Sequence, residues 1–327
     1  MSTEPLEVDP ALVPGGAAVV GAPAATPPEA ALAYESGLDV ERRSQWTDMR
    51  RRFFRHRLAV ISLAVLLVIF GAGLFAPWIA PYSFEGYDIS NTETGPTLHG
   101  FHIFGTDLPG RDYFSRVLYG IRTSERVAVI VMVLSVLIGT IIGMLAGFYG
   151  RWVDNLLMRF TDLMLTLPAQ AVLLTAAAFL GHGSPYRVAI ILAFVAWTQL
   201  ARIVRGQFLV LREREYVDAA RAVGAGDLRI MFRHMLPNSM GPILVTATLT
   251  LGGAILAEAA LSFLGFGVLP PTPALGKLIA DGQDVSAHDW WLVTFPGITI
   301  VLIVLCINFI GDGLRDALDP TQRRIRS

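Results

Sequence analysis

Six long stretches of apolar residues run along the chain, and shorter polar segments separate them. A helix needs about 20 apolar residues to cross the hydrocarbon core of a bilayer. The fourth stretch is the weakest, because Gln199 and Arg202 fall near one of its ends. The stretches are 58–80, 127–149, 163–181, 185–204, 240–266 and 292–311. This pattern predicts an all-α membrane protein with six transmembrane helices.

The composition agrees with a bilayer as the solvent. Of the 327 residues, 53% are hydrophobic and 16% are charged, whereas a soluble domain carries about 25% charged residues. The net charge is −1 and no basic domain stands apart from the apolar stretches, so we expect no nucleic-acid partner. Cys306 is the single cysteine, which excludes an intrachain disulfide. The six histidines lack the spacing of a metal site.

The placement of arginine predicts the orientation of the chain. With six spans, four segments lie on the same side of the membrane as the N-terminus: 41–57, 151–159, 202–233 and 315–326. Most of the 26 Lys and Arg residues fall in these segments. Cytoplasmic segments carry the excess of basic residues in membrane proteins. We therefore expect both termini and the loop 205–238 to be cytoplasmic, and the segments 81–126 and 267–291 to lie outside.

The predicted six-helix domain covers 58–318, and the chain ends lie beyond it. Residues 1–40 are rich in Pro, Ala, Gly and acidic residues and lack the pattern of a signal peptide, so we expect a disordered cytoplasmic tail. Residues 41–57 are expected to form a basic cytoplasmic segment, and residues 319–327 a cytoplasmic C-terminal tail.

Three glycines form a stripe in the second apolar stretch, at Gly139, Gly143 and Gly147. Small residues at four-residue spacing let helix backbones approach closely in a membrane. We expect this stretch to pack against other helices rather than against lipid. The two halves of the chain show no convincing inverted repeat, which weakens the case for a secondary transporter.

The loop 205–238 has the local features of two short helices, separated by Gly224-Ala225-Gly226. The first is predicted at 212–223 and the second at 228–236, with Asp227 as its N-cap and Pro237 at its end. The apolar positions expected to share a face are Val217, Ala220 and Val223 in the first helix, and Leu228, Met231, Met235 and Leu236 in the second. Such a face needs cover, from a groove in a partner protein or from the bilayer surface.

The same loop carries a recognisable motif. Asp218-Ala219-Ala220, Gly224 and His234-x-Leu236-Pro237 resemble the EAA loop of ABC importer permeases, with Asp218 in place of the usual Glu. Two further stretches resemble signatures of the C-type permease of dipeptide and oligopeptide importers. These are FGTDLPGRDYFSR at 104–116 and EAALSFLGFG at 258–267. The resemblance runs from about residue 45 to residue 322.

The resemblance implies a type I ABC importer permease fold and an ATP-driven peptide importer in a prokaryotic plasma membrane. In that family the loop inserts into the ATPase subunit. The implied coupling residues are Asp218, Ala219, Ala220, Arg221, Gly224, Asp227, His234, Leu236 and Pro237. The implied partners are a second homologous permease, two ABC ATPase subunits (or one fused chain) that hold ATP and Mg, an extracytoplasmic peptide-binding protein, the peptide substrate and membrane lipid.

Three arginines of the loop have two possible roles. Arg221, Arg229 and Arg233 either form a charged rim of the ATPase contact or only keep the loop inside the cell.

No energy-converting site is expected in this chain. Its one Gly-Lys pair, Gly276-Lys277, is followed by Leu278, and Pro271 stands where a nucleotide-binding loop has its first glycine. No nucleophile and base form a catalytic pattern. We therefore expect a chain without enzymatic activity or cofactor. Two other classes stay open: a stand-alone channel or secondary transporter, and a membrane scaffold or receptor.

Glu258 lies inside the fifth apolar stretch, where a carboxylate is expensive and faces a cavity or a partner. It either lines the translocation path, with Asn308 as a second candidate, or is a protonated or paired structural residue at a helix contact. Asn308 and Asp312 are its candidate hydrogen-bond partners. At the inner mouth of the third stretch, Arg159 and Asp162 are expected to pair locally.

The segment 81–126 contains a turn-rich run with Asp107 and Asp112. A calcium loop would need more acidic ligands at alternate positions. We therefore expect a structured outer loop that leads into the second span. Together with 267–291, this loop is expected to dock the binding protein.

Overall fold

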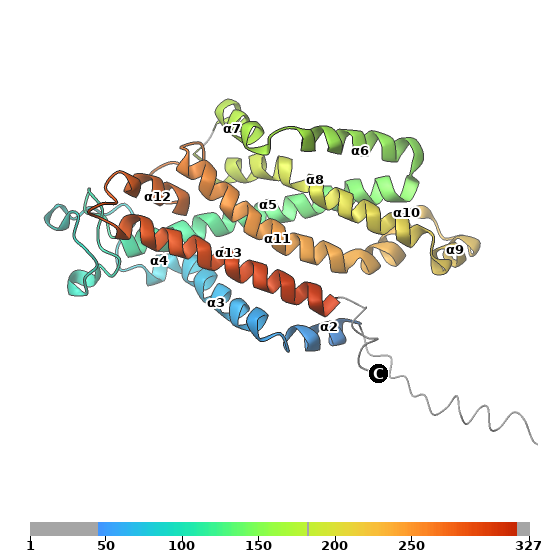
Figure 1. Ribbon diagram of the computed structural model, residues 1–327, viewed down its shortest axis with the longest axis horizontal. Helices are drawn as coiled ribbons and strands as arrows, with labels where there is room; N and C mark the ends of the chain where they lie inside the picture. The colour runs from blue at the N-terminus through green and yellow to red at the C-terminus, as the bar shows by residue number, and fades with distance from the viewer. Residues whose placement is uncertain (1–44, 182, 319–327) are drawn as a thin grey trace, which may run out of the picture. The chain divides into compact units, whose positions relative to one another are not determined.

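The computed structural model describes residues 45–181 and 183–318, and most of this part of the chain is helical (Figure 1). The predicted tails, 1–40 and 319–327, lie outside the described residues. The helical elements are α2 (Gln45–Phe53), α3 (Arg57–Leu74), α4 (Ala76–Ile79), the 3-10 turns η1 (Ile89–Asn91) and η2 (His99–Phe101), α5 (Tyr113–Tyr149), α6 (Arg151–Thr166), α7 (Ala169–Leu180), α8 (Pro185–Arg212), α9 (Glu215–Ala222), α10 (Asp227–Arg229), the π-helical turn η3 (Ile230–Met235), α11 (Leu236–Phe263), α12 (Leu275–Gln283) and α13 (Trp291–Leu318).

Five of the described helices are long and apolar enough to cross a membrane: α3, α5, α8, α11 and α13. The pair α6 and α7 passes the same test together, but it is bent by 88° at its break. The six predicted spans are therefore present, with the third in the form of a bent pair.

The third predicted span, 163–181, covers the end of α6 and all of α7, and it is bent between them. Pro168 lies at the break, and the residue before a proline is disfavoured in the helical region. Leu167 accordingly has an extended backbone, with φ −78° and ψ 138°. The helix on the N-terminal side of the break, α6, begins at Arg151 and contacts α8.

Ion pairs tie α6 to α8. Asp162 pairs with Arg202, and Asp154 pairs with Arg205. The predicted local pair of Arg159 with Asp162 is therefore wrong. The partner that Asp162 uses lies 40 residues away in the sequence, where spacing rules for a single helix do not apply.

The helix that contains the second predicted span begins earlier than that span, so the end of the predicted outer segment 81–126 is helical. α5 starts at Tyr113, and the carboxylate of Asp112 caps it by accepting a hydrogen bond from the backbone N–H of Ser115, at 2.8 Å. Residues 113–126 carry arginines and were therefore expected in the loop. Arg116 is only 4% exposed, and its guanidinium pairs with Asp107. The irregular part of the outer segment ends at Asp112, where α5 is capped.

The glycine stripe of α5 packs against α8, as predicted. A Cβ added at Gly139 would lie 2.8 Å from the carbonyl oxygen of Trp197. A Cβ at Gly147 would lie 2.6 Å from the Cβ of Phe208, and one at Gly143 would collide with the carbonyl oxygen of Ala201. The two helices therefore approach at a distance that only glycine permits at these positions.

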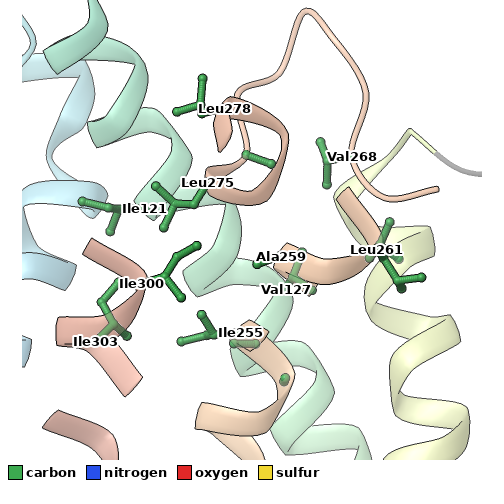
Figure 2. Packing of buried hydrophobic residues seen from close by; sticks show 14 of the residues in the cluster. Ile121, Val127, Ile255, Ala259, Leu261, Val268, Leu275, Leu278, Ile300 and Ile303 are labelled. Atoms are coloured by element: carbon green, nitrogen blue, oxygen red, sulfur yellow. The ribbon is translucent and has the colours of Figure 1, made fainter. Parts of the chain in front are cut away.

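The main core joins α5, α11, α12 and α13 (Figure 2). Leu275 and Leu278 of α12 are fully buried and belong to the same cluster as Ile255 and Ile303. The helix α12 lies within the predicted outer segment 267–291, so this segment is partly helical and packed into the core. Its close approach to α11 requires Gly276, where an added Cβ would collide with the backbone of Ala259.

Candidate functional site

The first helix of the loop, α9, is anchored by one face and open on the other. Val217 is fully buried and Ala220 is 8% exposed, as their predicted shared face requires. Val223 does not belong to this face. It lies just beyond the end of α9 and is 84% exposed, so the prediction that it shares a face with Val217 and Ala220 is wrong.

The motif residues of α9 that flank its buried positions are exposed. Asp218, Ala219 and Arg221 face away from the chain's own core. The carboxylate of Asp218 pairs with Arg221 at 3.1 Å, and the guanidinium of Arg221 also lies 5.9 Å from the ring centre of Phe148. An exposed ion pair of this kind contributes at most about 1 kcal/mol, so Asp218 remains available to a partner.

Gly224 ends α9 in a Schellman motif. Its N–H donates to the carbonyl of Arg221 at 2.9 Å, and the N–H of Ala225 donates to the carbonyl of Ala220 at 3.0 Å. The φ of Gly224 is +81°, a value that L-residues rarely adopt. Nothing lies within 4 Å of a Cβ built at this position. Glycine is therefore required at this position by the backbone conformation of the turn, not by a lack of room for a side chain.

The second half of the loop differs from the prediction at both ends. Gly226 precedes the helix, and Asp227 is its first residue and makes no side-chain cap. Pro237 does not end the helix, because the π-helical turn η3 runs directly into α11 and Pro237 lies in the first turn of α11. The side-chain amide of Asn238 donates a hydrogen bond to the carbonyl of His234, at 2.6 Å.

The chain itself covers half of the apolar face that was expected to need a partner or lipid. Met231 and Met235 are fully buried in a cluster with Val217, Phe208 of α8 and Phe148 of α5. Leu236 is half-buried. After the end of α8, the large apolar side chains that remain open on this loop are Tyr216 (40% exposed), Val223 (84%), Leu228 (66%) and Phe232 (53%).

We use the name loop tip for these four side chains and for the exposed Arg221, Arg229 and Arg233. The sequence pattern missed Tyr216 and Phe232. The signal that could have found them is that each is the sequence neighbour of a buried position, Val217 or Met231, and therefore points about 100° away from it around the helix.

Glu258 is fully buried at a contact between helices α5 and α11. Its carboxylate accepts hydrogen bonds from Ser124 of α5 at 2.6 Å and from Ser262 at 2.7 Å. Asn308 and Asp312 are not its partners, which corrects that prediction. Both are exposed on α13, and the Asn308 side chain lies beside Gly252 of α11. The arrangement matches the structural alternative considered for Glu258.

A groove of about 350 Å³ opens between α5, α7, α8 and α11. The lining includes Ala169, the first residue of α7. None of the described lining residues is charged. Gln199 of α8 and Thr246 and Thr250 of α11 are the polar members of this lining. Neither Glu258 nor Asn308 belongs to it.

The outer loop is held together by buried ionic contacts. Asp107 accepts hydrogen bonds from the backbone and the guanidinium of Arg111, each at 2.8 Å, and it also pairs with Arg116. Asp112 accepts a 2.9 Å hydrogen bond from the His102 ring in addition to its capping role. The indole of Trp291 donates to the carbonyl of Thr106 at 3.2 Å, which fastens the loop to α13. This run is a structured loop, as expected.

Comparison with known families identifies the class of protein. Residues 139–324 match the model of the binding-protein-dependent transport system inner membrane component, and residues 44–96 match the N-terminal TM domain of oligopeptide transport permease C. The chain belongs to the family of binding-protein-dependent transport system inner membrane components. The first match runs from the second half of α5 through α13 and includes the whole loop tip.

Relatives align over most of the chain. A putative peptide transport system permease protein of Brucella abortus is 47% identical over 83% of this chain and 90% of its own. The oligopeptide transport system permease protein OppC of Haemophilus influenzae is 40% identical over 88% and 92%. The dipeptide transport system permease protein DppC of Alkalihalophilus pseudofirmus is 40% identical over 86% and 91%.

A solved structure supports the fold. A chain of the MetNI methionine ABC transporter, in inward facing conformations, superposes with a TM-score of 0.52 at 18% identity and covers 62% of this chain and 96% of that one. The predicted type I ABC importer permease fold is confirmed.

A pair of substitutions separates the two interpretations of Glu258. Glu258→Gln keeps a polar group between Ser124 and Ser262, so we expect a melting temperature and transport rate near those of the parent. Glu258→Leu leaves both serine hydroxyls without their acceptor and should lower the free energy of unfolding by about 1–3 kcal/mol. Thermal unfolding in detergent and transport assays measure these effects. A well-folded Glu258→Gln protein that cannot transport would instead place the carboxylate in the translocation path.

Proposed function

We propose that this chain is the membrane-spanning permease subunit of an ATP-driven importer of dipeptides or oligopeptides. The relatives that align over most of its length are named for peptide, oligopeptide and dipeptide transport. The observation that carries the proposal is the loop tip, where apolar side chains stay open to solvent on a helix that the chain's own core anchors.

The loop tip is proposed to bind an ATPase subunit and to pass its movement to the helices. Val217 packs in one cluster with Phe208 of α8 and with Met231 and Met235 of η3, and η3 continues into α11. Packed interiors transmit displacement because they have little free volume. A displacement of α9 therefore shifts α8 and α11, two of the helices that line the groove.

The ATPase surface is proposed to fit the loop tip in two ways. Exposed apolar side chains such as Val223 and Leu228 suit a hydrophobic groove, and Arg221, Arg229 and Arg233 suit an acidic rim. ATP and Mg would be held by the ATPase subunits, and this chain would carry out no covalent chemistry.

The remaining partners follow from the same proposal. A second homologous permease would complete the translocation path, and an extracytoplasmic binding protein would deliver the peptide to the outer loops 81–112 and 267–291. The exposed apolar side chains Ile89 (86%) and Leu98 (82%) support a docking role for the first of these loops. Both termini and the loop tip would lie on the cytoplasmic side of a prokaryotic plasma membrane.

A stand-alone channel or secondary transporter is the alternative. Such a protein works without an ATPase, so this alternative leaves the exposed apolar side chains of the loop tip without a binding partner.

The composition of the purified complex tests the proposal. The chain is extracted from its native membrane in mild detergent, and co-purifying chains are identified by mass spectrometry. We expect two ATPase subunits, or one fused chain, and a second permease, and ATP-dependent peptide uptake after reconstitution with the binding protein. A lone chain that transports without ATP would contradict the proposal.

A further inference from the structure

Gln199 is a polar residue on the open face of a span. It lies on α8 one turn before Arg202, and its side chain is exposed, whereas its neighbours Trp197, Thr198 and Leu200 are buried. Within the described part of the chain, the Gln199 amide has no hydrogen-bond partner. An unpaired amide in hydrocarbon is costly, so such a side chain faces a cavity or a partner.

The groove supplies that cavity. Gln199 lines it from α8, and Thr246 and Thr250 line it from α11. α8 contacts both α7 and α11 in the bundle (Figure 1). The volume of about 350 Å³ lies within the range of small-molecule sites, roughly 300–1,000 Å³.

The polar groups of the groove suit a peptide backbone. The hydroxyl of Thr246 donates to the carbonyl of Pro242 at 2.8 Å, and that of Thr250 donates to the carbonyl of Thr246 at 2.9 Å. Their donors are therefore used inside α11, and their lone pairs remain as acceptors. The amide of Gln199 offers both a donor and an acceptor. Together these groups can accept a hydrogen bond from a peptide N–H and, through the Gln199 amide N–H, donate one to a peptide C=O.

The wall of the groove is also neutral. Its lining residues include no charged side chain, so an ionised side chain of the cargo meets neither an attractive nor a repelling charge. A hydrogen bond to the backbone is available to every peptide, whereas a charge in the wall would favour one sign of side chain.

We propose that Gln199, with Thr246 and Thr250, contacts the backbone of the peptide in transit, and that the neutral wall lets acidic and basic peptides pass alike. This inference rests on the proposed function, because it deepens the assignment of a peptide importer by naming the part of the cargo that the path recognises.

A charge placed at position 199 tests the inference. Gln199→Glu and Gln199→Lys are prepared in the complete complex with its binding protein. Uptake of Ala-Glu-Ala and of Ala-Lys-Ala is then measured, together with ATP hydrolysis. We expect Gln199→Glu to lower the ratio of acidic to basic peptide uptake by about tenfold or more, because like charges within a few ångströms repel strongly in a partly dry site. Gln199→Lys should shift the same ratio in the opposite direction.

Gln207→Glu is the matched control. Gln207 lies on the same helix and does not line the groove, so its replacement should leave the ratio unchanged. If the charged variants fail to assemble, Gln199→Cys is labelled after assembly with a negatively or positively charged thiol reagent. The native Cys306 is buried, so it should react little.

The outcomes separate the two levels of the proposal. If the parent complex imports both peptides and no charge at position 199 changes their ratio, Gln199 does not face the path and the inference is overturned. If the parent complex shows no ATP-dependent peptide uptake, the proposed function itself fails.

Discussion

Replacing Gly143 by leucine should prevent α5 and α8 from packing. A Cβ at this position would collide with the carbonyl oxygen of Ala201 and lie 2.8 Å from the Cβ of Val204. The colliding carbonyl belongs to the backbone, so the helix would have to move as a whole. Overpacking of a core costs about 1–3 kcal/mol and occasionally more, and we expect Gly143→Leu at the upper end.

Thermal unfolding of the detergent-solubilised protein, and the amount recovered as a monodisperse peak, measure this effect. Gly206→Leu is the control, since Gly206 lies on α8 with nothing within 4 Å of an added Cβ. Its effect should stay within about 0.5 kcal/mol. Equal melting temperatures for the two variants would show that α5 and α8 do not depend on this close approach.

Replacing Gly224 by valine should uncouple ATP hydrolysis from transport while leaving the protein in the membrane. The φ of +81° at this position costs an L-residue about 1–2 kcal/mol, and a β-branched side chain makes it worse. The space around the position is open, so the strain should reshape the turn after α9 rather than the bundle. An energy of this size changes an equilibrium roughly 5- to 30-fold, and we expect uptake to fall by a similar factor.

Uptake by reconstituted vesicles, ATP hydrolysis by the same complex and the membrane abundance of the chain are measured together. Gly224→Asn is the matched control, because asparagine tolerates the left-handed conformation better than other residues with a side chain. Its uptake should stay close to that of the parent. Loss of uptake in both variants to the same degree would mean that the conformation of the turn is not the cause.

The spans could be predicted because each depends on a local property, the length of an apolar run. The boundaries that were missed depend on distant residues. The early start of α5 was missed because Arg116 is charged and was expected in a loop. Its burial in the helix depends on its ion pair with Asp107 in the preceding loop. The break between α6 and α7 lies at Pro168, but the sequence does not state how far a proline bends a helix.

The loop shows the same division between local and distant causes. Gly224 and the buried face of α9 follow from turn and helix rules. The burial of Met231 and Met235 could not be foreseen, since they are covered by Phe148 of α5 and Phe208 of α8. A pattern of apolar residues indicates that a face needs cover, but it does not say whether that cover comes from the chain itself or from a partner.

The contact between the loop tip and an ATPase subunit is the centre of the proposed mechanism, and a cross-link tests it directly. Val223→Cys places a thiol at a position that is 84% exposed, in a chain whose native cysteine is buried. A short photoreactive group attached to this thiol in the assembled complex should form a covalent product with the ATPase subunit. The same group on Trp152→Cys, which is exposed on α6, serves as the comparison. A product with the ATPase from Val223→Cys, and much less from Trp152→Cys, is the expected result. Labelling of lipid alone from Val223→Cys would contradict the coupling role of the loop tip.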